Sequence, residues 1–148
     1  VPQGSMCVGR GGHMYHQNDK KLKAYRMALA KKADEFHDII YSTNADMGFE
    51  VTMVFYLERP KSVKRPLPTR KFDVDKLTRA VLDALTSNER YNIKGLWPDD
   101  CQVIRIKSTK YYTDDEHPEP CTIVTVRRVL RPKAFAADES ADSLDEDI

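Results

Sequence analysis

Two pairs of aspartates are the residues of this chain with the clearest capacity for chemistry. Asp73 and Asp75 are separated by one residue, and Asp99 and Asp100 are adjacent further along the chain. Carboxylate oxygens are hard ligands that suit Mg²⁺ and Mn²⁺, and Mg²⁺ usually binds one or two protein acids together with phosphate oxygens. The two pairs therefore predict a divalent-metal site that acts on a phosphate compound.

A basic, proline-rich segment precedes the first acidic pair. Its cations are Arg59, Lys61, Lys64, Arg65, Arg70 and Lys71, and its prolines are Pro60, Pro66 and Pro68. Because proline cannot donate to a central sheet ladder, we expect an exposed loop. Cations beside acids suit a nuclease, in which the cations hold the DNA backbone and the acids hold the metal that attacks it. A simple solvated connection is the alternative interpretation.

The first acidic pair lies at the start of a predicted helix, which runs from Asp73 to about Thr86. Its apolar residues recur at helical spacing: Val74, Leu77, Val81, Ala84 and Leu85. Asp73 is well placed as the N-cap, a role that alone would explain it, whereas Asp75 has no such duty. Asp75, Arg79 and Asp83 follow at i, i+4 and i+8 along one helix face. For Asp83 we favour an ion pair with Arg79 over a role as metal ligand.

The second acidic pair immediately precedes a predicted strand, Gln102–Tyr112. An acid at the beginning of a strand can point back at the N-terminus of a preceding helix, where it would supply a third ligand. Asp99 also follows Pro98, so ending a turn is an equally good explanation for it. Trp97 is more typical of a packing residue at the start of a strand than of a base-stacking residue.

Three further elements complete the predicted secondary structure. Apolar residues at helical spacing, with cations opposite them, predict a helix from Asp19 to about Tyr41. Strict alternation predicts a strand over Phe49–Leu57 with one buried face. Thr122–Leu130 is predicted as the last strand.

Length and composition bound the class of protein. The chain has 148 residues, of which 41% are hydrophobic and 32% charged, which is typical of one soluble globular domain. No apolar run approaches the roughly 20 residues of a membrane helix, so membrane insertion is not expected. Three widely spaced cysteines form no zinc-binding pattern and are read as reduced thiols in a cytosolic protein.

The net charge of +1 hides an uneven distribution. Residues 133–148 contain one basic and six acidic residues, so 23 basic and 17 acidic residues remain elsewhere, a net charge of about +6. This acidic tail lacks a core pattern and is predicted to be disordered. Residues 1–5 are typical of the remains of an expression tag. The predicted domain is therefore 6–132.

Three motifs in order carry a resemblance to a known family. They are Asp73-x-Asp75 with Arg79, then Asp83-Ala84-Leu85, then Asp99-Asp100-x-Gln102. Together they resemble the RusA crossover-junction endonucleases over roughly residues 70–110, with a looser match at Arg10–Tyr15 and the helix that follows. The resemblance implies a small α+β homodimer, with a mixed sheet flanked by helices, that cuts four-way (Holliday) junctions in DNA.

The same resemblance implies the roles of individual residues. Asp73, Asp75 and Asp100 would bind Mg²⁺, which Mn²⁺ can replace, and Arg79 would contact the scissile phosphate. Asp83 and Asp99 are possible accessory acids. The residues expected to bind DNA are Arg10, Lys61, Lys64, Arg65, Arg70, Lys71 and Lys76.

The chain departs from the family pattern at three places. Lys76 stands where an asparagine is usual, which places a cation beside the expected metal site. Arg79 replaces a lysine, so the donor becomes planar and cannot lose its proton. The family's first strand is almost absent after Met6, which bears on stability and dimer geometry more than on the chemistry.

Two other functions fit the same residues. The first is a protein that binds branched DNA without cutting it, for which Lys76 and the near-absent strand leave room. The second is an interaction protein whose acidic tail, residues 133–148, binds a partner. By analogy with small resolvases encoded by phages, a phage or prophage origin and the cytoplasm of a bacterial host are expected.

Overall fold

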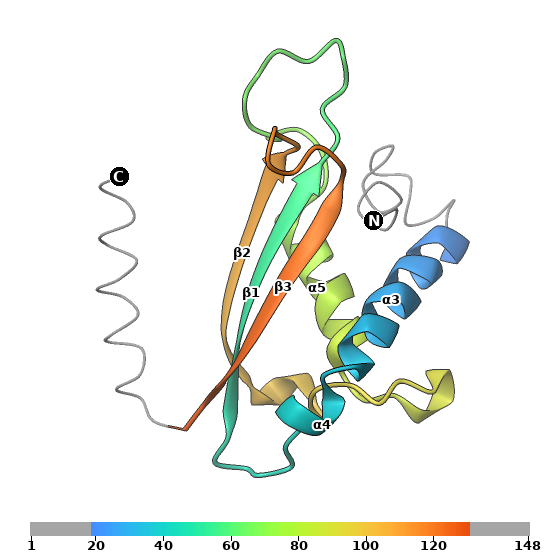
Figure 1. The fold of residues 1–148 in the computed structure, drawn as a ribbon, viewed down its shortest axis with the longest axis vertical. Coiled ribbons are helices and arrows are strands. Elements are labelled where there is room, and N and C mark those ends of the chain that lie inside the picture. Colours follow the sequence, from blue (N-terminus) through green and yellow to red (C-terminus); the bar gives the residue numbers. More distant parts are fainter. Residues whose placement is uncertain (1–18, 131–148) are drawn as a thin grey trace.

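A mixed three-stranded sheet carries the helices on one of its faces (Figure 1). The computed structural model describes residues 19–130, and their side chains from Lys23 onward. The elements are α3 (Asp19–Asp34), α4 (His37–Ile40), β1 (Gly48–Leu57), α5 (Val74–Leu85), β2 (Val103–Tyr112) and β3 (Cys121–Val129). Two 3-10 helices, η1 (Glu89–Tyr91) and η2 (Asp100–Gln102), lie between α5 and β2. The α+β prediction with a small mixed sheet is confirmed.

The central strand β1 organises the core. It pairs in parallel with β2 and antiparallel with β3. The buried side chains of β1 alternate along it: Phe49, Val51, Met53, Phe55 and Leu57. They pack against the apolar face of α5, whose buried residues are Leu77, Ala80, Val81, Ala84 and Leu85. The alternation predicted for this strand is therefore confirmed, with the strand beginning one residue earlier.

Two large aromatic residues attach the surrounding segments to this core. Tyr25 of α3 is fully buried, and its hydroxyl lies 3.0 Å from the hydroxyl of Thr122 on β3. Trp97 is also fully buried, 5.1 Å from Phe49 between ring centroids, and its Nε1 donates a hydrogen bond to Thr86 Oγ1 at 2.9 Å. Trp97 is therefore a packing residue, as predicted.

The helix predicted from Asp19 to about Tyr41 is confirmed as helical but is not continuous, because α3 ends at Asp34 and a separate helix, α4, begins at His37. The chain turns at Phe36, whose N–H donates to the Ala33 carbonyl at 2.8 Å. His37 Nδ1 then donates to the carbonyl of Gly95 at 2.6 Å. This long-range bond holds α4 against the loop that follows α5, which a continuous helix would not allow.

Gly95 permits the sharp return of the chain after α5. Its φ is +73°, and a Cβ there would lie 2.4 Å from the backbone nitrogen of Ser87 and 2.8 Å from the carbonyl oxygen of Leu85. The Leu85 oxygen accepts a hydrogen bond from Leu96 N at 2.7 Å. Only glycine leaves room for this approach of two backbone segments.

Several predictions concern residues outside those described. The tag remnant (residues 1–5), the loop with Arg10 and the acidic tail (residues 133–148) all lie outside residues 19–130. Within that range, none of the helices has both the length and the apolar character that crossing a membrane requires.

Replacing Gly95 with alanine should destabilise the protein markedly. The left-handed backbone alone costs about 1–2 kcal/mol for a residue with a Cβ, and the backbone clash adds to it. We expect the melting temperature of Gly95→Ala to fall by several degrees, measured by circular dichroism. Lys94→Ala, at the exposed neighbouring position, serves as the control and should melt like the wild type. Equal melting of the two variants would contradict the need for glycine.

Candidate active site

The N-terminal end of α5 carries the first acidic pair. Asp73 occupies the N-cap position as predicted, but its carboxylate makes no capping hydrogen bond. Instead, its Oδ2 lies 3.0 Å from Nζ of Lys76, with both side chains more than half exposed. Asp75 lies in the first turn and is exposed. Both carboxylates therefore lie beside the partial positive charge of the helix N-terminus.

Lys110 holds the backbone that leads into this helix. Its Nζ donates to the carbonyl oxygens of Lys71 at 3.0 Å and Phe72 at 2.9 Å. Phe72 has a φ of +64°, which is uncommon for a bulky residue and costs free energy. Lys110 was not predicted from the sequence to belong to the site. The feature that could have indicated it is a lysine at a position of β2 that lies beside the buried Phe55 of β1 in the strand register.

The basic segment is an exposed loop, as predicted. It joins β1 to α5 (Figure 1), and most of its charged side chains are exposed: Arg59, Lys61, Lys64, Arg70 and Lys71. Arg65 is half-buried beside a hollow of about 360 Å³ that Pro68 and Phe72 also line. The loop thus presents a concentration of positive charge directly before Asp73.

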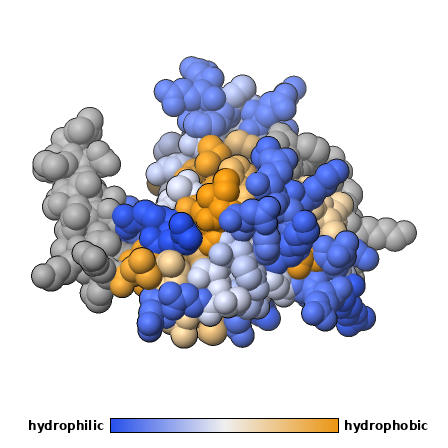
Figure 2. Space-filling model, turned by 60° about the horizontal axis from the view of Figure 1, so that its bottom comes forward, coloured by the Kyte–Doolittle hydropathy of each residue, from blue (hydrophilic) through white to orange (hydrophobic). Residues whose placement is uncertain are grey.

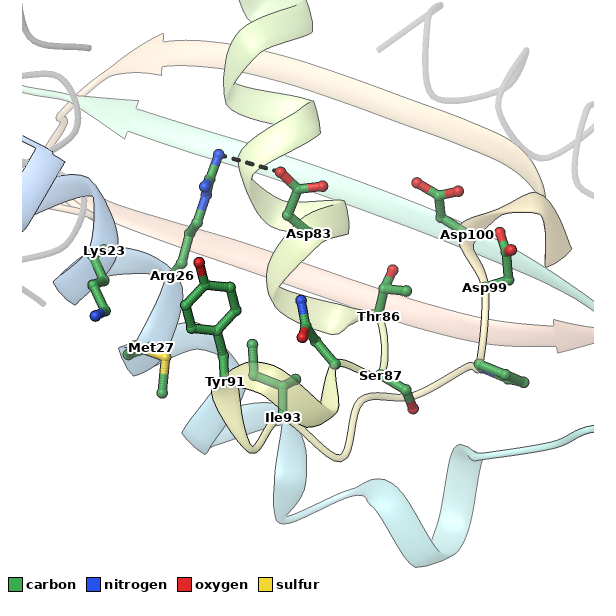
Figure 3. Close-up of a pocket in the computed structure, with 12 residues that line it drawn as sticks. Lys23, Arg26, Met27, Asp83, Thr86, Ser87, Tyr91, Ile93, Asp99 and Asp100 are labelled. Atoms are coloured by element: carbon green, nitrogen blue, oxygen red, sulfur yellow. Dashed lines mark ion pairs between the residues drawn. The ribbon is translucent and has the colours of Figure 1, made fainter. Parts of the chain in front are cut away.

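The predicted ion pair between Asp83 and Arg79 is wrong. Asp83 Oδ2 pairs with Nη2 of Arg26 on α3, at 3.2 Å (Figure 3). The reason is tertiary: α3 packs along α5 and brings Arg26 across to the helix face that Asp83 occupies. Arg79 is exposed in the middle of α5. Its guanidinium is therefore presented to solvent on the same helix as Asp75.

The second acidic pair borders a cavity of about 600 Å³ at the C-terminal end of α5. Figure 3 shows Asp83, Asp99 and Asp100 along one side of it. Asp99 caps η2, since its Oδ1 accepts a hydrogen bond from the Cys101 N–H at 2.9 Å. This bond lowers the pKa of the Asp99 carboxyl below its usual value. Asp99 therefore has a structural role, while Asp100 is exposed beside it.

The two acidic pairs lie at opposite ends of α5. Asp83 is about 12 Å further along the helix axis than Asp75, at a rise of about 1.5 Å per residue, and Asp100 borders the same cavity as Asp83. β2 begins where α5 ends, because Thr86 bridges to Trp97 just before η2. The expected approach of the second pair to the helix N-terminus within one chain is therefore wrong. No three acidic, histidine or cysteine side chains meet as a metal cluster within residues 19–130.

Comparison with known proteins gives one family match. The family model described as "Endodeoxyribonuclease RusA" matches residues 2–127, which is most of the chain. No curated protein matches the chain.

The partner of Asp83 can be measured in solution by double-mutant cycles on the free energy of unfolding. For Arg26 and Asp83 replaced by alanine, singly and together, we expect a coupling of about 0.2–1 kcal/mol, because the pair is partly exposed. The matched cycle of Arg79 with Asp83 should give a coupling near zero. A larger coupling in the second cycle than in the first would show that Asp83 prefers the partner on its own helix.

Proposed function

The chain belongs to the RusA family of endodeoxyribonucleases, and on that basis we propose that it is a metal-dependent, structure-selective enzyme that resolves four-way DNA junctions by paired, symmetric incisions. The observation that carries the proposal is the placement of exposed carboxylates next to a strongly basic loop, at the start of α5. Acids alone would repel DNA, and cations alone would only bind it.

The cations account for binding to the DNA backbone. The loop before α5 presents its lysines and arginines to solvent, and Lys76 and Arg79 continue the positive charge along the exposed side of α5. Phosphate contacts of this kind supply most of the affinity for DNA and make it fall with added salt. The planar guanidinium of Arg79 suits a bidentate contact with the scissile phosphate. Lys76, 3.0 Å from Asp73, reduces the repulsion between that carboxylate and the approaching phosphate.

The acids account for the metal. Asp73, Asp75 and Asp100 would hold Mg²⁺, or Mn²⁺ in its place. When bound, the ion supplies an activated water and stabilises charge on the phosphate. Ligand oxygens of Mg²⁺ lie about 2.1 Å from the ion. The three acids of one chain cannot meet this requirement, because they lie at the two ends of α5.

A homodimer resolves this conflict. We place Asp73 and Asp75 of one copy beside Asp100 of the other, so that a two-fold axis creates two equivalent sites. Two such sites match a junction, which has approximate two-fold symmetry and needs two incisions. An apolar area at the end of the molecule that carries the start of β2 supports an interface there: Ile39 and Ile104 are 65% and 54% exposed, and Figure 2 shows apolar side chains at this end among hydrophilic ones.

The first test compares a synthetic four-way junction with linear duplex of the same sequence, in Mg²⁺, Mn²⁺ and chelator. We expect paired nicks on the junction only, and only with metal. Asp75→Asn should cut at least about 100-fold more slowly, because a ligand is lost, yet bind the junction as tightly or more so, since it removes a charge facing phosphate.

The control is Asp46→Asn, the same change at an exposed position in the turn before β1, which should cut like the wild type. Junction binding without cutting in either metal would favour the non-catalytic reading of the fold. Absence of both binding and cutting would contradict the proposed function.

The composite site is tested by mixing two inactive proteins, Asp75→Asn and Asp100→Asn, after unfolding and refolding them together. If one site takes acids from both copies, a mixed dimer has one intact site and regains nicking of a single strand. If all three acids served one chain, every site of the mixed dimer would remain defective. A mixture of Asp73→Asn with Asp75→Asn is the matched control and should stay inactive, because both acids come from the same copy.

A further inference from the structure

The cavity beside Asp100 has a second wall that the proposed metal site does not use. Across from Asp99 and Asp100 lie Lys23 of α3 and Tyr91 of η1, while Arg26 of α3 is paired with Asp83 (Figure 3). The cavity of about 600 Å³ falls in the size range of small-ligand sites. One wall therefore carries Asp99 and Asp100, and the other combines an aromatic ring with the cation of Lys23.

The position of Tyr91 is set by a closed loop. Asn88 and Ile93 exchange two backbone hydrogen bonds of 2.9 Å, and the N–H of Asn92 donates to the Glu89 carbonyl at 3.1 Å. Asn92 takes a left-handed conformation, with φ of +54°, which ends η1. The loop thus holds Tyr91 in a defined place. Core packing does not explain its ring, because the residue is 42% exposed.

Two cations lie over this exposed ring. Nζ of Lys23 lies 5.8 Å from the ring centroid of Tyr91, and Cζ of Arg90 lies 5.5 Å from it. Proteins bind unpaired nucleotides by stacking the base on an exposed aromatic ring while nearby cations bind the phosphate. A base that stacks on Tyr91 would displace one of these cations from the ring face, and the cation would stay close enough to bind the phosphate.

Asn88 also lines the cavity, and its side-chain amide can hydrogen-bond to a base edge. The hydroxyls of Thr86 and Ser87 already donate to the carbonyls of Leu82 and Lys94.

From these observations we propose that the cavity receives one unpaired nucleobase of the branched DNA, stacked on Tyr91, with its phosphate near Lys23 and Arg90. The inference rests on the proposed function and adds a determinant of substrate selectivity to it. A base in continuous duplex must leave its stack to enter, which costs free energy, whereas a base at a branch point is less firmly held. The pocket therefore favours branched over linear DNA.

The test removes the nucleobase from the DNA and leaves the cavity of the protein unchanged. A set of four-way junctions carries a single abasic residue at each position next to the crossover, and their affinities are measured with Asp75→Asn protein, which leaves the DNA uncut. The protein should bind one of these junctions about tenfold more weakly than the intact junction. In the Asp75→Asn, Tyr91→Ala double variant this discrimination should disappear, and with Tyr91→Phe in place of Tyr91→Ala it should return.

Tyr111→Ala is the matched control, because Tyr111 is equally exposed, at 44%, but lies on β2 away from the cavity. It should discriminate like the parent protein. Equal affinity of the parent for all abasic junctions, or unchanged discrimination after Tyr91→Ala, would overturn the pocket while leaving junction cutting by the wild type intact. Discrimination through Tyr91 in a protein that never cuts would support the pocket and refute the endonuclease function.

Discussion

The direction in which the chain leaves α5 is the constraint on which the rest of the structure depends. Gly95 lets the loop close onto the last turn of α5, and the burial of Trp97 against Phe49 fixes that closure in the core. β2 therefore starts at the C-terminal end of the helix and runs back along it beside β1. Asp100, directly before this strand, is carried to the far end of α5 from Asp73. The proposal of a two-copy active site rests on this return of the chain.

The periodic elements could be predicted from the sequence because burial of one face leaves a local pattern. The alternation of β1 and the apolar stripe of α5 are examples, and the basic loop was predicted from its prolines. Features set by contacts between distant residues could not be predicted in this way. The break after α3 depends on a bond from His37 to the carbonyl of Gly95, and the partner of Asp83 depends on how α3 crosses α5.

The same distinction between local pattern and long-range contact applies to the candidate site. The types of the acids and their order in the chain were sufficient to identify the family, but they carried no information on which acids meet. Asp99 is engaged by the backbone of η2, and Asp83 by Arg26, so each acid around the cavity except Asp100 has a described structural partner. Tyr91 lay outside every motif, because an aromatic residue in a polar loop has no periodic signal. Its proposed role depends on Lys23 of α3, which the fold brings beside it.

Lys110 links the two acidic pairs through strand β2, and this link fixes the distance between them. Its ammonium binds the two carbonyls that precede Asp73, while the strand to which it belongs begins just after Asp100. The two acidic ends of the molecule are thus joined by about 23 Å of hydrogen-bonded strand, at about 3.3 Å per residue, and by the helix alongside it. Their separation is set by regular secondary structure. In the proposed dimer, two copies would therefore have to adopt one relative position to complete the sites, and the distance between the two proposed cuts in the DNA would be built into the protein.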